Sequence, residues 1–327
     1  MKKIISILMI AALLITALCA CGEAKTETST DDAKSFKVAI VQQLDHSSLD
    51  EIRKAIEAEL DARAAKEGVT VTYDEFNGQN DATALNQIGA QVASDGYDAV
   101  IPIATLAAQC MVTAVEDKMP IVYSAISDPA AAGLTDIANV TGTSDALNTP
   151  FILDMMFAAS DVKTVGLLYS NSEANSATPI AEAKEYLDAK GIPYIEKTGN
   201  TTDEIVSAAN SLVGRVDAVF TPTDNVVMAA EGAVAEILGE AGIPHYAGAD
   251  SFVTAGGFAT CGVNYTELGA YTADMAFDIL LGGAVPEYHV MDGGIITVNT
   301  DTADALGIDY SAFSGMANTL VEVTTAE

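Results

Sequence analysis

Short apolar runs rich in β-branched residues alternate with longer amphipathic stretches along most of this chain. Residues 36–41 (FKVAIV) predict a strand, and residues 49–66 predict a helix that Ser47 or Ser48 caps and Gly68 ends. The same order recurs, with strands at 69–76, 98–103 and 121–124 and helices from Asp81 to Ser94 and over 106–118. Strands that alternate with helices form a parallel sheet covered on both faces, so the pattern predicts an α/β fold.

The second half of the chain repeats the pattern of the first half. Residues 37–43 match 164–170, residues 97–102 match 216–221, and residues 119–123 match 243–247, at offsets of 119 to 127. Ordered matches at similar offsets indicate two lobes of like topology. The predicted fold class is therefore two similar α/β lobes, each a doubly wound parallel sheet, and a chain of 327 residues is long enough for both.

Polar loops follow the predicted strands in both halves. In open α/β sheets, ligands bind beyond the carboxyl ends of the strands, where helix N-termini present free N–H groups. If two such sheets face each other, their loops line one cleft. The side chains in these loops are mainly hydroxyls, amides and carboxylates, which suit hydrogen bonding to a small solute. The loops are residues 42–48, 104–109, 124–129, 169–176, 222–225 and 248–251.

The N-terminus looks like a bacterial lipoprotein signal. Lys2 and Lys3 precede an apolar run at 4–17, and the sequence LCACG follows at 18–22. The prediction is a signal peptide at 1–20, lipidation of Cys21 and a polar flexible tether at 21–35. An uncleaved membrane helix is the alternative, but the apolar run is shorter than the roughly 20 residues that a span needs.

We therefore expect the folded part to lie on the extracytoplasmic side of the cell membrane, held there by the lipid anchor only. Whether this is a Gram-positive surface or a periplasm is left open.

Composition and missing motifs narrow the function. The net charge of −31 opposes binding to nucleic-acid phosphates. The mature chain has no nucleophile elbow, phosphate-binding loop, HExxH or CxxC motif, and its histidines, His46, His245 and His289, are too scattered for a metal cluster. We expect no catalytic residue, no metal and no cofactor. Cys110 and Cys261 are interpreted as buried thiols, although pairing between them is left open.

Several segments together resemble a known family. Besides the N-terminal signal they are IATLAAQ, PIVYSAISDPAAAGL, NVTGTSD, LLYSNSEANS, VDAVFTPTDN and GVNYTELGAYTADMAFDIL. From Phe36 to the C-terminus the chain resembles the tryptophan/tyrosine-type substrate-binding lipoproteins of ABC transporters, which have a type I periplasmic-binding-protein fold.

The resemblance implies a non-enzymatic, monomeric receptor that closes around a solute and delivers it to an ABC permease in the membrane. An amino acid is the implied solute, with an aromatic one favoured. It also implies three crossings between the lobes, near 144–149, 255–258 and 283–287, and places the helix that begins at Glu267 in the N-terminal lobe. The expected N-terminal lobe is 36–146 and 257–284, and the expected C-terminal lobe is 147–256 and 285–327.

For an amino-acid solute, the resemblance implies hydroxyl and N–H groups around the α-carboxylate and an acidic partner for the α-ammonium. For the carboxylate the first candidate is Thr105. It is helped by Ser124 and Ser127, with Asn175 and Ser176 reaching in from the other lobe. For the ammonium the first candidate is Asp224, followed by Glu173 and Asp250. The full set of candidate ligand-binding residues is Gln43, Thr105, Ser124, Ser127, Asp128, Tyr169, Ser172, Glu173, Asn175, Ser176, Thr223, Asp224, Asn225 and Asp250.

Simpler interpretations exist for many of these residues. Thr105, Ser127, Asn175 and Asp224 stand where helices are predicted to begin, so each is also a candidate helix cap. Asp128 before Pro129 also fits a turn. Tyr123, Tyr169 and Tyr265 suit either stacking on an aromatic solute or packing in the core, and His46 suits either the solute or solvent.

Two other classes of function are alternatives to import. One is an extracytoplasmic sensor that reports ligand occupancy to a receptor, and the other, a surface hydrolase, is disfavoured by the missing catalytic motifs. The solute itself could instead be a nucleoside or a sugar.

Overall fold

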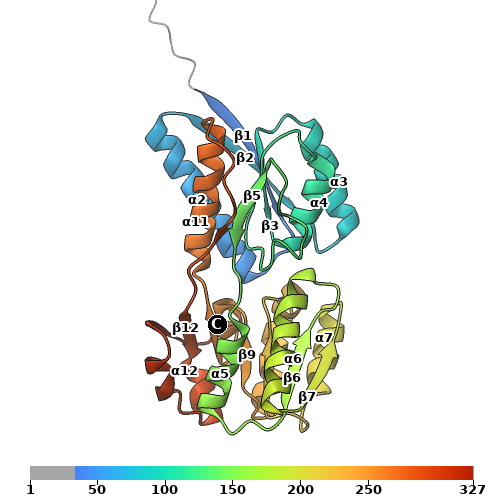
Figure 1. Cartoon of the computed structure of the whole chain (residues 1–327), viewed down its shortest axis with the longest axis vertical. Coiled ribbons are helices and arrows are strands. Elements are labelled where there is room, and N and C mark those ends of the chain that lie inside the picture. The colour runs from blue at the N-terminus through green and yellow to red at the C-terminus, as the bar shows by residue number, and fades with distance from the viewer. Residues whose placement is uncertain (1–33, 327) are drawn as a thin grey trace, which may run out of the picture. The chain divides into compact units, whose positions relative to one another are not determined.

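The computed structural model describes residues 34–326, which form two α/β lobes (Figure 1). The N-terminal lobe contains a six-stranded sheet in the order β11-β5-β4-β3-β1-β2, and every neighbouring pair is parallel. Its strands are β1 (Ser35–Gln42), β2 (Thr70–Asn77), β3 (Ala99–Ile103), β4 (Ile121–Tyr123), β5 (Val140–Ser144) and β11 (His289–Val290). Its helices are α2 (Ser47–Glu67), α3 (Ala82–Ser94), α4 (Thr105–Val115) and α11 (Tyr265–Leu280).

The C-terminal lobe contains a seven-stranded sheet in the order β13-β12-β10-β9-β8-β6-β7. Its strands are β6 (Val165–Tyr169), β7 (Tyr194–Thr198), β8 (Ala218–Thr221), β9 (His245–Ala247), β10 (Ala259–Gly262), β12 (Ile295–Asn299) and β13 (Thr319–Val323). Its helices are α5 (Thr149–Ala159), α6 (Ala177–Lys190), α7 (Thr202–Asn210), α8 (Asn225–Met228), α9 (Glu231–Glu240), α10 (Asp250–Thr254) and α12 (Thr300–Leu306), with short 3₁₀ turns η1 (Ala174–Ser176) and η2 (Ser311–Gly315).

The internal repeat predicted from the sequence is confirmed by the strand order. The series β2-β1-β3-β4-β5 in one lobe corresponds to β7-β6-β8-β9-β10 in the other. One departure from a purely parallel arrangement is the antiparallel pair β10–β12, which adds two late strands to the edge of the second sheet.

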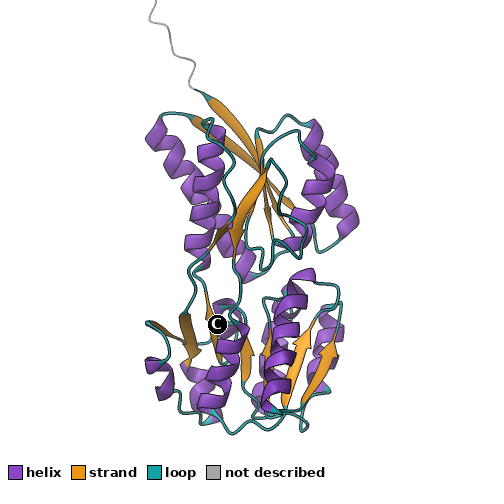
Figure 2. Ribbon diagram, viewed as in Figure 1, coloured by secondary structure: helices purple, strands orange, loops and turns teal. Residues whose placement is uncertain are grey.

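Helices cover both faces of the first sheet, as Figure 2 shows. On one face α2 packs against α11, and on the other α3 packs against α4. Because both faces are covered, β1 is apolar without alternation, and Val38, Ala39, Ile40 and Val41 are all buried.

The expected helix signals are confirmed in two cases and wrong in one. Asp81 caps α3 by accepting from the N–H groups of Thr83 and Ala84, and Gly68 ends α2 in the left-handed conformation (φ 67°). Neither Ser47 nor Ser48 caps α2, because the N-cap position belongs to His46, which makes no capping bond with its side chain.

Three segments connect the lobes, and two of them lie later in the chain than the sequence indicated. The first runs between β5 and α5, through residues 145–148. The second lies at 263–264 rather than 255–258, because β10 is still part of the second sheet. The third lies at 291–294 rather than 283–287, because β11 still pairs with β5 in the first sheet. Residues 257–262 therefore belong to the C-terminal lobe and residues 285–290 to the N-terminal lobe.

Two further expectations concern cysteines and the membrane. Cys110 and Cys261 are free and buried, so they do not pair. None of the helices within residues 34–326 is long and apolar enough to cross a membrane. The signal peptide, Cys21 and nearly all of the tether lie outside the described residues.

The contact between α2 and α11 depends on a glycine. A Cβ atom added to Gly269 would lie 2.6 Å from the backbone oxygen of Ile52 and 2.8 Å from the Cβ of Ala55. Such distances leave no room for a methyl group, so an alanine there must push the two helices apart.

We expect Gly269→Ala to lower the free energy of unfolding by about 1–3 kcal/mol in urea denaturation. The control is Gly239→Ala in α9, where no atom lies within 4 Å of the added Cβ, and which should be neutral or slightly stabilising. Equal stability of the two variants would contradict this account of the helix contact.

Candidate functional site

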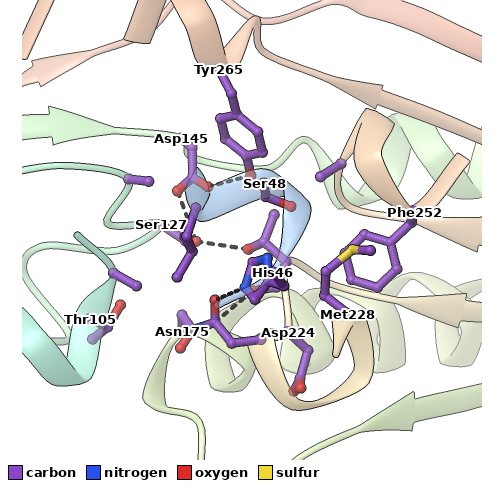
Figure 3. Close-up of a pocket in the computed structure, with 16 residues that line it drawn as sticks. His46, Ser48, Thr105, Ser127, Asp145, Asn175, Asp224, Met228, Phe252 and Tyr265 are labelled. Atoms are coloured by element: carbon purple, nitrogen blue, oxygen red, sulfur yellow. Dashed lines mark hydrogen bonds between the residues drawn. The ribbon is translucent and has the colours of Figure 1, made fainter. Parts of the chain in front are cut away.

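A small cavity lies between the two lobes and is lined by residues from both (Figure 3). The lining segments follow β1, β3, β4, β5, β6, β8, β9 and β10, because parallel strands bring their carboxyl ends to one edge of each sheet. The enclosed volume is about 20 Å³, close to that of a single water site, so a larger solute can enter only when the lobes move apart. The lining residues are His46, Ser48, Leu49, Ala104, Thr105, Ala125, Ser127, Asp145, Asn175, Thr223, Asp224, Asn225, Met228, Ala249, Phe252 and Tyr265.

Side chains from the two lobes bond directly to each other around this cavity. Four of these contacts are Gln43 Nε2 to Glu173 Oε1 (2.9 Å), His46 Nε2 to Asn225 Oδ1 (3.0 Å), Ser127 Oγ to Thr223 Oγ1 (2.9 Å) and Thr178 Oγ1 to Asp128 Oδ2 (2.8 Å). A fifth joins the hydroxyls of Ser48 and Ser251. The lobes are therefore closed on each other.

Two alanines in the cavity wall have strained backbones. Ala104, at the start of α4, has a φ of 74°, and Ala125, after β4, has a φ of 58°. Positive φ in a residue with a side chain costs on the order of 1–3 kcal/mol and persists where the surrounding structure holds it. Ala104 immediately precedes the polar cavity residue Thr105, and Ala125 lies two residues before the polar cavity residue Ser127.

Asp145 is a buried carboxylate in the cavity wall, on the first segment that connects the lobes. Its Oδ1 accepts from Ser127 Oγ and its Oδ2 accepts from Tyr265 OH, each at 3.0 Å. Burial raises the pKa of Asp145, and these two hydrogen bonds oppose that rise. Among the described residues no Lys, Arg or His forms an ion pair with it, so its charge is met by neutral groups, namely the two hydroxyls and its own backbone N–H.

Glu173 is a second buried carboxylate, at the contact between η1 and the N-terminal lobe. Its Oε1 accepts from Gln43 Nε2 at 2.9 Å and its Oε2 accepts from Asn225 Nδ2 at 2.6 Å. Burial, together with the neighbouring charge of Asp224, raises the pKa of Glu173 to about 7. Glu173 therefore links the two lobes and changes its protonation state near neutral pH.

Asp224 is the third buried carboxylate, and its hydrogen bonds come entirely from its own lobe. Its Oδ1 accepts from the N–H groups of Val226 and Val227, and its Oδ2 accepts from Ser170 N–H and Ser176 Oγ. The cap interpretation of Asp224 is therefore confirmed, since it is the N-cap of α8. With four donors around it, this carboxylate has little capacity left for another partner.

Thr105 is the first residue of α4, and its side chain makes no hydrogen bond within residues 34–326. It is not the N-cap, which is Ala104. The next N–H of the helix, from Leu106, donates to Gln43 Oε1 at 3.0 Å. The hydroxyl of Thr105 thus stands at the positive end of a helix dipole on the cavity wall.

The structure brings most of the candidate residues to the interface between the lobes. Six line the cavity: Thr105, Ser127, Asn175, Thr223, Asp224 and Asn225. Four stand behind or beside it in hydrogen bonds to cleft residues: Gln43, Asp128, Glu173 and Ser176.

Ser124, Tyr169, Ser172 and Asp250 do not border the cavity. Ser124 bonds to Thr272 in the core, Tyr169 donates to Glu196, and Ser172 bonds to Ser170 in its own loop. Asp250 lies at the start of α10, where burial raises its pKa to about 6.

The cavity also contains residues that were not among the candidates. Asp145 follows a strand but lies in a connecting segment rather than in one of the six polar loops, which is why it was not a candidate. Ser48 and His46 both lie in the predicted cleft loop 42–48. Ser48 was named only as a possible cap, and His46 was interpreted either as a solute contact or as a solvated residue. Met228 and Phe252 supply apolar wall, and Tyr265 contributes its hydroxyl to Asp145. The sequence NVTGTSD, which ends at Asp145, carried the one available signal.

A hydroxyl, an imidazole and a carboxylate lie in a row elsewhere in the C-terminal lobe. His245 Nε2 is 2.8 Å from Thr221 Oγ1, and His245 Nδ1 is 2.8 Å from Glu231 Oε1. All three residues are buried and none borders the cavity, so a solute has no path to the hydroxyl. The row is part of the core rather than a catalytic site.

Comparison with known proteins identifies the family. Residues 37–314 match the family described as ABC transporter substrate binding protein. The chain belongs to this family. Its two lobes have the type I periplasmic-binding-protein fold that the sequence indicated.

Relatives with bound or named ligands include two amino-acid binders. A tyrosine-binding protein of Clostridioides difficile is 31% identical over 319 residues, which are 93% of this chain and 92% of that protein. The crystal structure of a Streptococcus pneumoniae ABC domain in complex with L-Trp is 30% identical, with a TM-score of 0.82 over 88% of this chain and all of that one. The ligand-free, open structure of a substrate binding protein with adhesive properties from Clostridium difficile is 34% identical, with a TM-score of 0.66 over 89% of this chain and all of that one.

The L-Trp complex and the ligand-free, open structure together indicate the conformation of this substrate-binding protein. The L-Trp complex is less identical in sequence than the open structure, yet it superimposes better. The difference in sequence identity does not explain why the TM-score is higher for the complex. A closed arrangement of the lobes in this protein does explain it, because closure rotates one lobe against the other. The hydrogen bonds between the lobes point the same way.

The raised pKa of Glu173 predicts how the stability of this substrate-binding protein depends on pH. Its pKa lies near 4.5 in the unfolded chain and about 7 in the folded one, so its proton favours the folded state. Stability from this group is fully present below about pH 4.5 and is lost as the pH rises to about 7.

We expect Glu173→Gln to remove a pH-dependent term on the order of 3 kcal/mol between those limits, measured by urea denaturation at a series of pH values. Asp145 and Asp224, whose pKa values are also raised, keep part of the slope, and His46, whose pKa is lowered, acts in the opposite direction at acidic pH. Glu236→Gln, on the exposed surface of α9, controls for the loss of one carboxylate. An unchanged slope in Glu173→Gln would show that this carboxylate is not the source.

Proposed function

We propose that this protein is the lipid-anchored, extracytoplasmic solute-binding component of an ABC importer, and that it closes around an aromatic amino acid. The observation that carries the amino-acid assignment is Asp145, a buried carboxylate at the cavity with no cationic partner within residues 34–326. Leaving a buried charge without a counter-charge is costly, and an ammonium group of the solute would supply one.

The carboxylate of the solute has a separate place to bind. Thr105 presents an unpaired hydroxyl at the N-terminus of α4, where the helix dipole favours negative charge. Asn175 reaches the same cavity from the C-terminal lobe. A zwitterion needs opposite partners for its two ends, and Asp145 and Thr105 provide them.

The side chain of the solute meets an apolar part of the wall. Phe252 and Met228 line the cavity on one side (Figure 3). The ring of Phe252 and the thioether of Met228 both pack well against an aromatic side chain of the solute. The names of the relatives, a tyrosine-binding protein and a complex with L-Trp, agree with an aromatic amino acid.

The rest of the proposal follows from the N-terminus and from the family. Lipidation of Cys21 after removal of residues 1–20 would hold the protein at the membrane, where an ABC permease receives the solute. Both walls of the cavity come from one chain, so binding and closure need no second subunit. They also need no enzymatic activity and no cofactor, and the protein therefore acts as a monomeric binding protein.

A thermal-shift panel tests the solute class. L-tyrosine, L-tryptophan and L-phenylalanine should raise the melting temperature, whereas glucose, ribose and uridine should not. A ligand at about 100 times its dissociation constant stabilises the bound protein by roughly 2.7 kcal/mol. Stabilisation by a sugar or a nucleoside, with none from the amino acids, would contradict the proposal.

Asp145→Asn should weaken binding of the stabilising amino acid by on the order of 10- to 100-fold in calorimetry, because the ammonium loses its counter-charge. The ligand-free variant should be at least as stable as the wild type, since a buried charge has been removed. Asp188→Asn, on the exposed surface of α6, is the matched control. Loss of binding together with loss of stability would indicate a structural role for Asp145 instead.

A further inference from the structure

His46 stands at the point where the N-terminal lobe meets the C-terminal lobe and the cavity. It follows β1 and occupies the N-cap position of α2, but its side chain makes no capping bond. The ring lies in the cavity wall among Ser48, Ser127 and Asn175 (Figure 3). Its two nitrogens have different surroundings, and this difference defines what the ring can offer a solute.

The Nε2 atom of His46 is a donor, because a chain of hydrogen bonds fixes its direction. Above the pKa of Glu173, about 7, its carboxylate is ionised and can only accept, so Asn225 turns its Nδ2 group toward Glu173 Oε2, 2.6 Å away. Asn225 then presents its Oδ1 to His46 Nε2 at 3.0 Å. An oxygen acceptor at that distance requires a proton on Nε2.

The ring is neutral, so Nδ1 carries no proton. Burial lowers the pKa of His46, against smaller opposing effects from Asn225, Asp50 and Asp45. The N-terminus of α2, a helix of 21 residues, also disfavours a positive charge on its N-cap. A neutral imidazole with its proton on Nε2 has a bare lone pair on Nδ1.

This lone pair has no partner within residues 34–326. Nδ1 of His46 is shielded from solvent and accepts no hydrogen bond. A buried acceptor left without a donor costs roughly 1–3 kcal/mol, and such groups are rare unless function requires them. The cavity is the open space that the ring borders.

We propose that His46 is a specificity-determining residue whose bare Nδ1 accepts a hydrogen bond from an N–H or O–H group of the solute. This inference rests on the proposed function, since it concerns recognition of the same solute in the same cavity. Two groups of an aromatic amino acid can donate this bond: the α-ammonium, or the donor on the ring, which is the phenol of tyrosine or the indole N–H of tryptophan. Phenylalanine has only the first.

Two substitutions separate the two nitrogens of the ring. His46→Gln places an amide N–H near the position of Nε2, so it keeps the bond to Asn225 and removes the acceptor. His46→Asn places an amide oxygen near the position of Nδ1, so it keeps the acceptor and loses the bond to Asn225. Affinity for L-tyrosine, L-tryptophan and L-phenylalanine is measured by calorimetry at pH 8, where Glu173 is ionised.

We expect His46→Gln to weaken binding of L-tyrosine by on the order of 10- to 100-fold, and His46→Asn to weaken it less. A loss for tyrosine and tryptophan but not for phenylalanine assigns the bond to the ring donor, and an equal loss for all three assigns it to the ammonium. Wild-type affinity in His46→Gln, or a larger loss in His46→Asn, would overturn the inference while leaving the proposed function intact. Failure of the wild type to bind any of the three would overturn both.

The proton itself can be located by nuclear magnetic resonance. The chain has three histidines, so a protein labelled with ¹⁵N-histidine gives a simple spectrum. With L-tyrosine bound at pH 8, His46 should show a protonated Nε2 and an unprotonated Nδ1, and the Nδ1 resonance should shift when tyrosine is added. A proton on Nδ1 in the complex would exclude its role as an acceptor.

Discussion

Three carboxylates are buried between or beside the closed lobes without a cation from residues 34–326. They differ in how many hydrogen bonds each accepts, and this difference determines which of them can bind a cationic group of a solute. Asp224 accepts from four donors of its own lobe, and Glu173 accepts from two amides, one from each lobe. Asp145 accepts from two hydroxyls. Donors to an ionised carboxylate offset its desolvation, so the two carboxylates with two donors each have more to gain from a cationic group than Asp224 has. Of these two, Asp145 is the one that lines the cavity.

The same balance explains why closure can depend on a solute. The five side-chain contacts between the lobes contribute on the order of 0.5–1.5 kcal/mol each. Burial of Glu173 and Asp145 on closing acts against them, since both carboxylates lose water. When such terms nearly cancel, a ligand that touches both lobes shifts the population toward the closed state by its differential contacts, and one that touches a single lobe shifts nothing.

Most of the fold was predictable because the chain contains the same α/β pattern twice. The internal repeat matched three strands of one lobe with three of the other, and the strand order adds two more pairs, β2 with β7 and β5 with β10. One offset of the repeat, 119 residues, leads from β5 at 140–144 to β10 at 259–262. Extending the repeat would have corrected the second crossing, which was placed too early. That α11 covers the first sheet could come only from resemblance, because the period of a helix does not specify which sheet it covers.

The site was only partly predictable, and the reason lies in distance along the chain. A loop after a strand can be read locally, which is why Thr105, Ser127 and Asn175 were found. The hydrogen-bond partners of His46 cannot be predicted in this way. Asn225 is 179 residues away from His46 along the chain, and Glu173 is linked to His46 through its hydrogen bond to Asn225. Two of these three residues lie in the C-terminal lobe and His46 lies in the other, so the direction of its hydrogen bonds is fixed only when the lobes meet. The chemical character of that part of the wall is therefore a product of closure, and selection among solutes takes place at the closing step rather than at first encounter.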